Sequence, residues 1–170
     1  MEIARNICQL VYDPSDMQPD SPVFAAASEA GFGSFTVVDV ETSGLSAASH
    51  RVLSIAALTL DDDGAVTREF HTLIDPGCNP GPVHIHGLTR ELLNGAPRFE
   101  HIEEELTELL AGRVMVAHNA RFDYDFLAAE FDRMGATPPI GHRLCTLALA
   151  RRVSLPIPNY QLPTLAKYYG

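Results

Sequence analysis

The stretch 35-FTVVDVETSGL-45 holds two acids, Asp39 and Glu41, inside an apolar run. A β-strand alternates its faces with a period of two residues, so side chains two positions apart emerge on the same face, about 6–7 Å from each other. Both carboxylates are therefore expected on one face of a strand, and Val38 and Val40 are expected on the other.

This pair of acids predicts a metal site. Two like charges held side by side on a buried strand repel each other and lose solvation. A divalent cation removes both penalties, and oxygen ligands suit hard metals such as Mg²⁺ or Mn²⁺. The alternative interpretation is an edge strand on which Asp39 and Glu41 are simply solvated.

A third acid lies on the apolar side of a later helix. That stripe, at spacings of four, four and three, consists of Asp123, Leu127, Phe131 and Met134. A carboxylate facing the core is costly unless it meets a cation, so Asp123 is the third candidate ligand. Asp125 falls on another side of the helix and is expected to be solvated. The alternative role for Asp123 is an N-terminal acid favoured by the helix dipole.

Composition narrows the classes of protein that the chain can belong to. Its 170 residues are enough for one domain with a sizeable core. No apolar run is long enough to cross a membrane, and the N-terminus lacks the order of a secretory signal. Three widely spaced cysteines favour a reducing, cytoplasmic location. The net charge of −10 argues against gripping long nucleic acid through a basic surface, so any nucleic acid would be held locally, over a few nucleotides.

The order of elements predicts an α/β fold. Three hairpin-linked strands are expected at 34–41, 51–60 and 65–74, with Asp61–Gly64 as a turn, and a short strand at 114–117. Residues 1–33 are interpreted as an N-terminal extension, with one short helix near 23–30. Predicted helices span Thr89–Leu93, Arg98–Leu110, Asn119–Met134, 146–152 and 163–169. This order indicates a mixed sheet with helices packed on it.

Five segments in order resemble the DEDD superfamily of 3′–5′ exonucleases, in its DEDDh branch. Residues 37–45 resemble its first motif and residues 117–127 its second. His86-Gly87-Leu88-Thr89 is similar to a segment of the bacterial proofreading branch, which includes the epsilon subunit of DNA polymerase III. Residues 144–151 and 162–170 resemble the helix after motif two and the approach to motif three. The resemblance covers about residues 34–170, which are therefore expected to form an exonuclease domain.

The resemblance implies a ribonuclease H-like fold and hydrolysis of 3′-terminal nucleotides with two metal ions, Mg²⁺ or Mn²⁺, about 3.5–4 Å apart. Asp39 would bridge both metals, Glu41 would bind one and contact the terminal nucleotide, and Asp123 would bind the second. Motif three of the family supplies a general-base His and, five residues later, a metal-binding Asp. This pair has no match in the sequence, which ends at Gly170, so we expect a truncated or degraded relative.

Four further residues are candidate substrate-binding groups by resemblance. Thr42 would offer its backbone and hydroxyl to the 3′ end, and Leu45 would wedge against terminal bases, with core packing as the alternative. His86 would touch the terminal nucleotide, with a backbone hydrogen bond as the alternative. Asn119 would contact substrate or simply cap its helix.

Two hypotheses follow from the sequence. The first is a 3′–5′ exonuclease acting on single-stranded DNA ends in proofreading or repair, with RNA 3′ ends as a variant. The Glu-Thr-Ser-Gly-Leu form of motif one and the His-Gly segment favour DNA. The second is a non-catalytic module that binds nucleic acid or a protein, because motif three is absent. A polymerase or a repair protein is the expected partner, and no membrane is involved.

Overall fold

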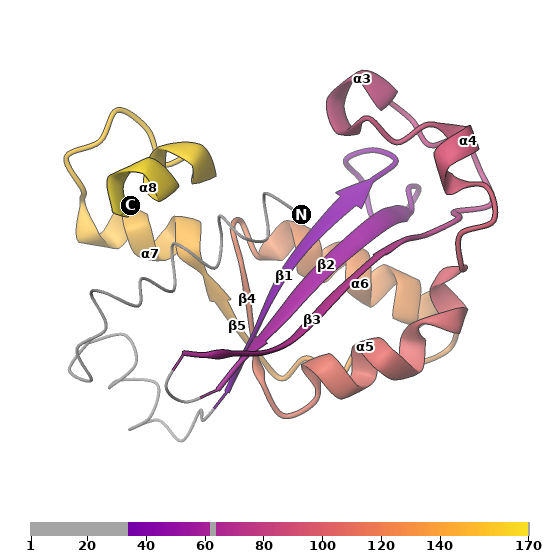
Figure 1. Ribbon diagram of the computed structural model, residues 1–170, viewed down its shortest axis with the longest axis horizontal. Helices are drawn as coiled ribbons and strands as arrows, with labels where there is room; N and C mark the ends of the chain where they lie inside the picture. The colour runs from indigo at the N-terminus through magenta and orange to yellow at the C-terminus, as the bar shows by residue number, and fades with distance from the viewer. Residues whose placement is uncertain (1–33, 62–63, 170) are drawn as a thin grey trace.

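A five-stranded mixed sheet forms the centre of the computed structural model, which describes residues 34–61 and 64–169 (Figure 1). The strands are β1 (Phe35–Thr42), β2 (Val52–Leu60), β3 (Val66–Leu73), β4 (Val114–Ala117) and β5 (His142–Cys145), in the order β3-β2-β1-β4-β5. The helices are α3 (Val83–His86), α4 (Arg90–Leu93), the 3₁₀-helix η1 (Phe99–His101), α5 (Glu103–Leu110), α6 (Arg121–Arg133), α7 (Thr146–Val153) and α8 (Leu162–Tyr169). The predicted extension 1–33 and its helix lie outside the described residues.

The strand directions confirm the predicted mixed sheet. β1 pairs antiparallel with β2 and β2 pairs antiparallel with β3, whereas β4 runs parallel to β1 and β5 runs parallel to β4. Gly64, at the end of the β2–β3 turn, has φ +78°, the left-handed conformation that glycine adopts without strain. Strand β5 was not predicted, because its four residues carry no clear alternation and His142 and Arg143 are exposed.

The two faces of β1 pack against different sets of side chains, as its alternation predicts. Val38 and Val40 lie in the larger core with residues of α5 and α6, where Phe99 and Phe131 meet edge to face. Helix α6 passes behind the strands in Figure 1. The opposite face of β1 contributes Phe35 and Val37 to a smaller cluster, against which the first residue of α8 packs. Asp39 and Glu41 continue this second face toward the end of the strand.

Two predicted helix boundaries were wrong. The helix expected over Arg98–Leu110 is interrupted at Ile102. The backbone N–H groups of His101 and Ile102 donate to the carbonyl oxygens of Arg98 and Phe99 and close a separate 3₁₀ turn before α5 begins. The helix expected from Asn119 begins at Arg121, since Asn119 has a left-handed φ of +67°. Within the described ranges, no helix has the length and apolar character needed to cross a membrane.

Candidate active site

The candidate site lies where β1 loses its parallel neighbour. β4 pairs with β1 only from Phe35 to Val37, so the carboxyl-terminal half of β1 continues without a partner from β4. Asp123, in the first turn of α6, lies beside this free part of β1. Its Oδ1 accepts a hydrogen bond from the backbone N–H of Val40 at 3.2 Å. The tertiary structure therefore brings Asp123 next to the strand that carries Asp39 and Glu41.

The three carboxylates share a poorly solvated, negatively charged environment. Burial raises the pKa of Asp39 to about 6, and the charge of Glu41 adds to the effect. Burial, followed by the charge of Asp39, raises the pKa of Asp123 to about 8, although the backbone N–H groups of Asp123 and Val40 oppose the shift. Burial also raises the pKa of Glu41, against the opposing electrostatic effect of His86. Each group therefore resists ionisation in the absence of a cation.

The side-chain chemistry of these three residues suits a hard divalent cation. All three offer carboxylate oxygens, and none of the ion pairs in the described residues gives them a Lys or Arg partner. Among residues 34–61 and 64–169, however, no three His, Cys, Asp or Glu side chains are gathered as a ready metal site. One oxygen of Asp123 is directed to Val40 instead. The carboxylates are thus close enough to shift one another's pKa without converging on a single point.

Asp125 lies apart from this group, as its place on the helix predicts. Its side chain is about half exposed and pairs with the more exposed Arg121 at 3.5 Å. Asp123 is only 4% exposed. Two acids two residues apart on α6 therefore have opposite environments, because α6 turns one toward the sheet and the other toward solvent.

The loop after β1 presents Leu45 to solvent. Its side chain is 89% exposed, which excludes the core-packing alternative. The hydroxyl of Thr42 donates to the carbonyl oxygen of Gly44 at 2.7 Å, which leaves its lone pairs for a further donor. Gly81 closely approaches this loop: a Cβ atom at Gly81 would lie 2.0 Å from the carbonyl oxygen of Ser43. This contact joins the loop after β1 to the segment that leads into α3.

His86 makes hydrogen bonds with the backbone, as its alternative interpretation expected. Its Nδ1 accepts from the N–H of Leu88 at 3.0 Å, so Nε2 carries the proton and donates to the carbonyl oxygen of Pro80 at 3.1 Å. Both ring nitrogens are engaged, yet the ring remains half-buried and within electrostatic range of Glu41. His86 thus lies at the border of the carboxylate group.

Asn119 does not cap its helix. Its side chain is exposed and makes no capping hydrogen bond, while its carbonyl oxygen accepts from the N–H of Phe122 at 2.8 Å. The capping interpretation was therefore wrong. The neighbouring His118 is half-buried, and its Nδ1 lies 3.0 Å from the hydroxyl oxygen of Thr146, which opens α7.

Sequence reasoning missed a buried ion-pair network that joins α6 to the loop between β1 and β2 and to the start of β2. Glu130 of α6 is 1% exposed. It accepts bonds from Nε and Nη2 of Arg51, both at 2.8 Å, and from the N–H of Val52 at 3.1 Å. Arg133 pairs with Glu130 at 3.3 Å and also donates to the carbonyl oxygens of Ala47 and His50. Only the local Glu130–Arg133 spacing was visible in the sequence.

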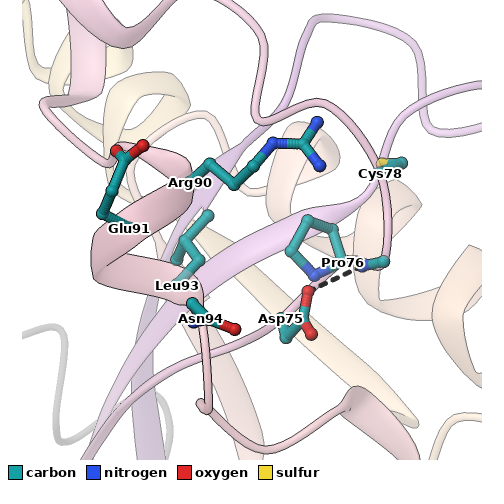
Figure 2. A pocket seen from close by; sticks show the side chains of 8 residues that line it. Asp75, Pro76, Cys78, Arg90, Glu91, Leu93 and Asn94 are labelled. Carbon is teal, nitrogen blue, oxygen red and sulfur yellow. Dashed lines mark hydrogen bonds between the residues drawn. The ribbon is translucent and has the colours of Figure 1, made fainter.

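A cavity of about 430 Å³ lies away from the carboxylates. Figure 2 shows it between α4, which contributes Arg90 and Glu91, and the loop around Asp75, where the N–H of Gly77 donates to Oδ1 of Asp75 at 2.9 Å. None of Asp39, Glu41 and Asp123 lines this cavity. The candidate site is therefore the carboxylate group at the end of β1, not this cavity.

Solved structures share the fold. A complex of exonuclease I with the C-terminus of SSB superimposes with a TM-score of 0.72 at 20% identity, covering 80% of this chain and 36% of the other. E. coli exonuclease I with a dA16 oligonucleotide also gives a TM-score of 0.72, at 21% identity, covering 81% of this chain and 36% of the other. These matches establish a ribonuclease H-like exonuclease fold.

Sequence comparison identifies the family. The chain is 38% identical to the DNA polymerase III subunit epsilon of Treponema pallidum over 141 residues, which are 80% of this chain and 65% of that protein. It is 33% identical over 137 residues to the PolC-type DNA polymerase III of Halalkalibacterium halodurans, covering 79% of this chain and 10% of that much longer protein. The family profile described as exonuclease, RNase T type, matches residues 36–170. The chain therefore belongs to the RNase T/DEDD family of exonucleases.

Proposed function

We propose that this chain is a 3′–5′ exonuclease that hydrolyses single-stranded DNA ends with two divalent metal ions. The observation that carries the proposal is the group of Asp39, Glu41 and Asp123. Burial raises the pKa of all three, a neighbouring carboxylate raises those of Asp39 and Asp123 further, and none has a Lys or Arg partner in the described residues. Buried, mutually repelling carboxylates are stabilised strongly when cations bind to them. The sequence similarity to two bacterial DNA polymerase III proteins supports DNA as the substrate.

The proposed roles follow from position. Asp39, Glu41 and Asp123 would hold Mg²⁺ or Mn²⁺, which when bound supplies an activated water and stabilises charge at the scissile phosphate. Thr42, at the end of β1, and Asn119, between β4 and α6, would bind the terminal sugar and phosphate. Leu45 projects from the loop after β1 and would pack against the terminal base. His86 would complete the pocket for the terminal nucleotide beside Glu41.

No residue of the described ranges is assigned as the general base. The His and Asp of the family's third motif have no counterpart in the printed sequence, and both ring nitrogens of His86 are already engaged. The proposed activity therefore needs a proton acceptor beyond the three carboxylates. A positioned base typically contributes about 10²–10⁴-fold to the rate.

A 5′-labelled oligonucleotide tests the proposal. The 170-residue chain is compared with a chimera in which the segment that follows the corresponding position in the Treponema pallidum epsilon subunit is joined after Gly170. We expect the chimera to shorten the oligonucleotide from its 3′ end in Mg²⁺ or Mn²⁺, releasing nucleoside 5′-monophosphates, and the chain alone to be slower by at least about 100-fold. An RNA of the same sequence tests the RNA variant. A chimera that binds DNA but never shortens it would contradict the proposal.

A second candidate function is a non-catalytic module that binds nucleic acid or a protein partner. It is favoured by the absence, among the described residues, of three ligands already gathered around one point. Oligonucleotide binding by Asp39→Ala in the presence of Mn²⁺ separates the two candidates, because a non-catalytic binding module keeps its affinity when Asp39 is replaced by Ala. A polymerase or repair protein as partner and a cytoplasmic location, where Cys78 and Cys145 would stay free thiols, complete the proposal.

A further inference from the structure

The charges of this acidic chain are distributed very unevenly. All 22 Asp and Glu residues precede position 133, so residues 133–170 contain five Lys or Arg and no acid. Such an asymmetry is typical of proteins that bind a polyanion with one part of their surface. The net charge of −10 hides this basic C-terminal part.

The fold gathers four of these cations on β5, α7 and α8, which lie together at one end of the molecule (Figure 1). We call this the basic surface; it consists of Arg143, Arg151, Arg152 and Lys167, all exposed. Within the described residues none of the four forms an ion pair with an acid. Arg143 instead stacks on the ring of Tyr124, at 3.7 Å from its centroid. Their charges are thus available to a ligand.

Exposed aromatic rings accompany these cations. Tyr168 and Tyr169, at the end of α8, are 46% and 42% exposed and meet edge to face at 5.1 Å. Proteins that hold single strands combine cations along the backbone path with aromatic rings on which bases stack. A folded acidic protein would use the cations but would have no comparable need for stacking rings. The composition of the basic surface therefore favours a single-stranded nucleic acid.

The basic surface adjoins the carboxylate group through two contacts. Leu162, which opens α8, packs against the sheet face formed by Phe35 and Val37, the face that Asp39 and Glu41 continue. Thr146, which opens α7, lies 3.0 Å from His118 at the start of the segment that leads to Asp123. Arg151 is also within electrostatic range of His118, whose pKa is lowered mainly by burial and further by this charge.

We infer that the basic surface on β5, α7 and α8 binds the part of a single DNA strand that lies 5′ of the nucleotide held at the carboxylates. This inference rests on the proposed function and extends it from one nucleotide to a path for the strand. Phosphates would contact Arg151, Arg152 and Lys167, and bases would stack on Tyr169. The acidic remainder of the molecule would repel the strand from other routes.

Fluorescence anisotropy with two thymidine oligonucleotides tests the path. A dinucleotide reaches only the carboxylate group, while one of about 15 nucleotides can also cover the basic surface. Measurements are made in Ca²⁺, a hard cation for oxygen ligands. The variants are Arg151→Ala, Arg152→Ala, Lys167→Ala and Tyr169→Leu. Arg68→Ala, on β3 at the opposite edge of the sheet, is the control with the same change of charge.

Each Arg or Lys variant should bind the longer oligonucleotide about fivefold more weakly and lower the slope of log affinity against log salt by about 0.7. Tyr169→Leu should cost about tenfold with no change of slope. The dinucleotide should be unaffected, and Arg68→Ala should match the wild type. Circular dichroism checks that each variant is folded.

Three outcomes overturn the inference. If the wild type binds the longer oligonucleotide and the variants equal Arg68→Ala, the path is wrong while the proposed function stands. If the wild type binds neither oligonucleotide, the proposed function fails and the inference fails with it. If polyglutamate binds as tightly as DNA and Tyr169→Leu has no effect on either, the surface belongs to an acidic polypeptide.

Discussion

The Asp123 carboxylate and the Val40 backbone N–H are joined by a 3.2 Å hydrogen bond across 83 residues of sequence. The bond ties the first turn of α6 to β1 where β4 no longer pairs with it. It also holds a buried carboxylate beside Asp39, which helps to raise the pKa of Asp123 to about 8. The bond itself favours the ionised carboxylate, so the cost of ionising Asp123 comes from its burial and from the charge of Asp39.

Asp123→Asn should stabilise the metal-free protein at high pH. The pKa of Asp123 is about 8 in the folded state against 3.8 for the ordinary side chain, so the folded state holds the proton more tightly and stability falls as pH rises between these values. Asp39, at about 6, contributes in the lower part of the window. Asparagine is neutral and still offers an oxygen to Val40.

Thermal unfolding in EDTA at about pH 5 and about pH 9 measures this effect. The variant should unfold several degrees above the wild type at the higher pH and differ little at the lower one. Asp125→Asn, at the exposed neighbouring acid, is the matched control and should show no such gain. An equal melting temperature for Asp123→Asn and wild type at the higher pH would contradict the raised pKa.

Mn²⁺ binding should depend on Asp39 and Asp123 and not on Asp125. Calorimetry should show binding that either Asp39→Ala or Asp123→Ala weakens by at least about 100-fold, with a parallel loss of oligonucleotide digestion by the chimera. Asp125→Ala should keep most of both. Because the pKa of about 8 leaves Asp123 protonated near neutral pH, metal binding should release its proton, seen as a heat that varies with the buffer. Unchanged binding in Asp39→Ala would place the metal elsewhere.

Glu130→Ala should destabilise the protein by about 3–5 kcal/mol, because it leaves Arg51 and the N–H of Val52 without their buried hydrogen-bond acceptor. Urea unfolding measures the loss. Asp132→Ala, at an exposed acid two residues along the same helix, should change the free energy of unfolding by less than about 0.5 kcal/mol. Similar losses in both variants would mean that the Glu130 network contributes little.

Gly81→Ala should separate the loop after β1 from the segment that leads into α3. Gly81 has φ +81°, and an added Cβ would lie 2.0 Å from the carbonyl oxygen of Ser43. Gly95→Ala is the control, because Gly95 has φ +83° and open space around it. The control should cost about 1–2 kcal/mol in urea unfolding. Gly81→Ala should lower the free energy of unfolding by more than the control and should also lower oligonucleotide affinity. Equal losses in the two variants would show that the close approach of Gly81 to Ser43 relaxes at little cost.

Leu45→Ala should leave stability unchanged and weaken binding of the DNA 3′ end. The side chain is 89% exposed, so its loss removes little buried area and should change the free energy of unfolding by less than about 0.5 kcal/mol. Loss of its contact with the terminal base should raise the KM of the chimera about tenfold. Leu109→Ala, at a buried position of α5, should instead cost about 2–5 kcal/mol. An unchanged KM would remove Leu45 from the proposed site.

Periodicity made several features predictable. The alternation of β1 assigned Val38 and Val40 to one face and Asp39 to the other, and the stripe on α6 separated buried Asp123 from exposed Asp125. These features follow from local backbone geometry, which a short segment carries by itself. The order of strands and helices likewise predicted a mixed sheet, and similarity over five segments predicted the family.

Local sequence patterns were thus enough to predict which side chains face the core and which acids are candidates for metal. The three-dimensional structure was needed to show that β4 stops pairing at Val37, that Asp123 occupies the free edge of β1, and that Glu130 neutralises Arg51 from 79 residues away. It also decided the break at Ile102 and the left-handed turn at Asn119. The physical reason is that these features depend on contacts between distant segments, whose hydrogen bonds and charges can override the local preferences that a sequence pattern reveals.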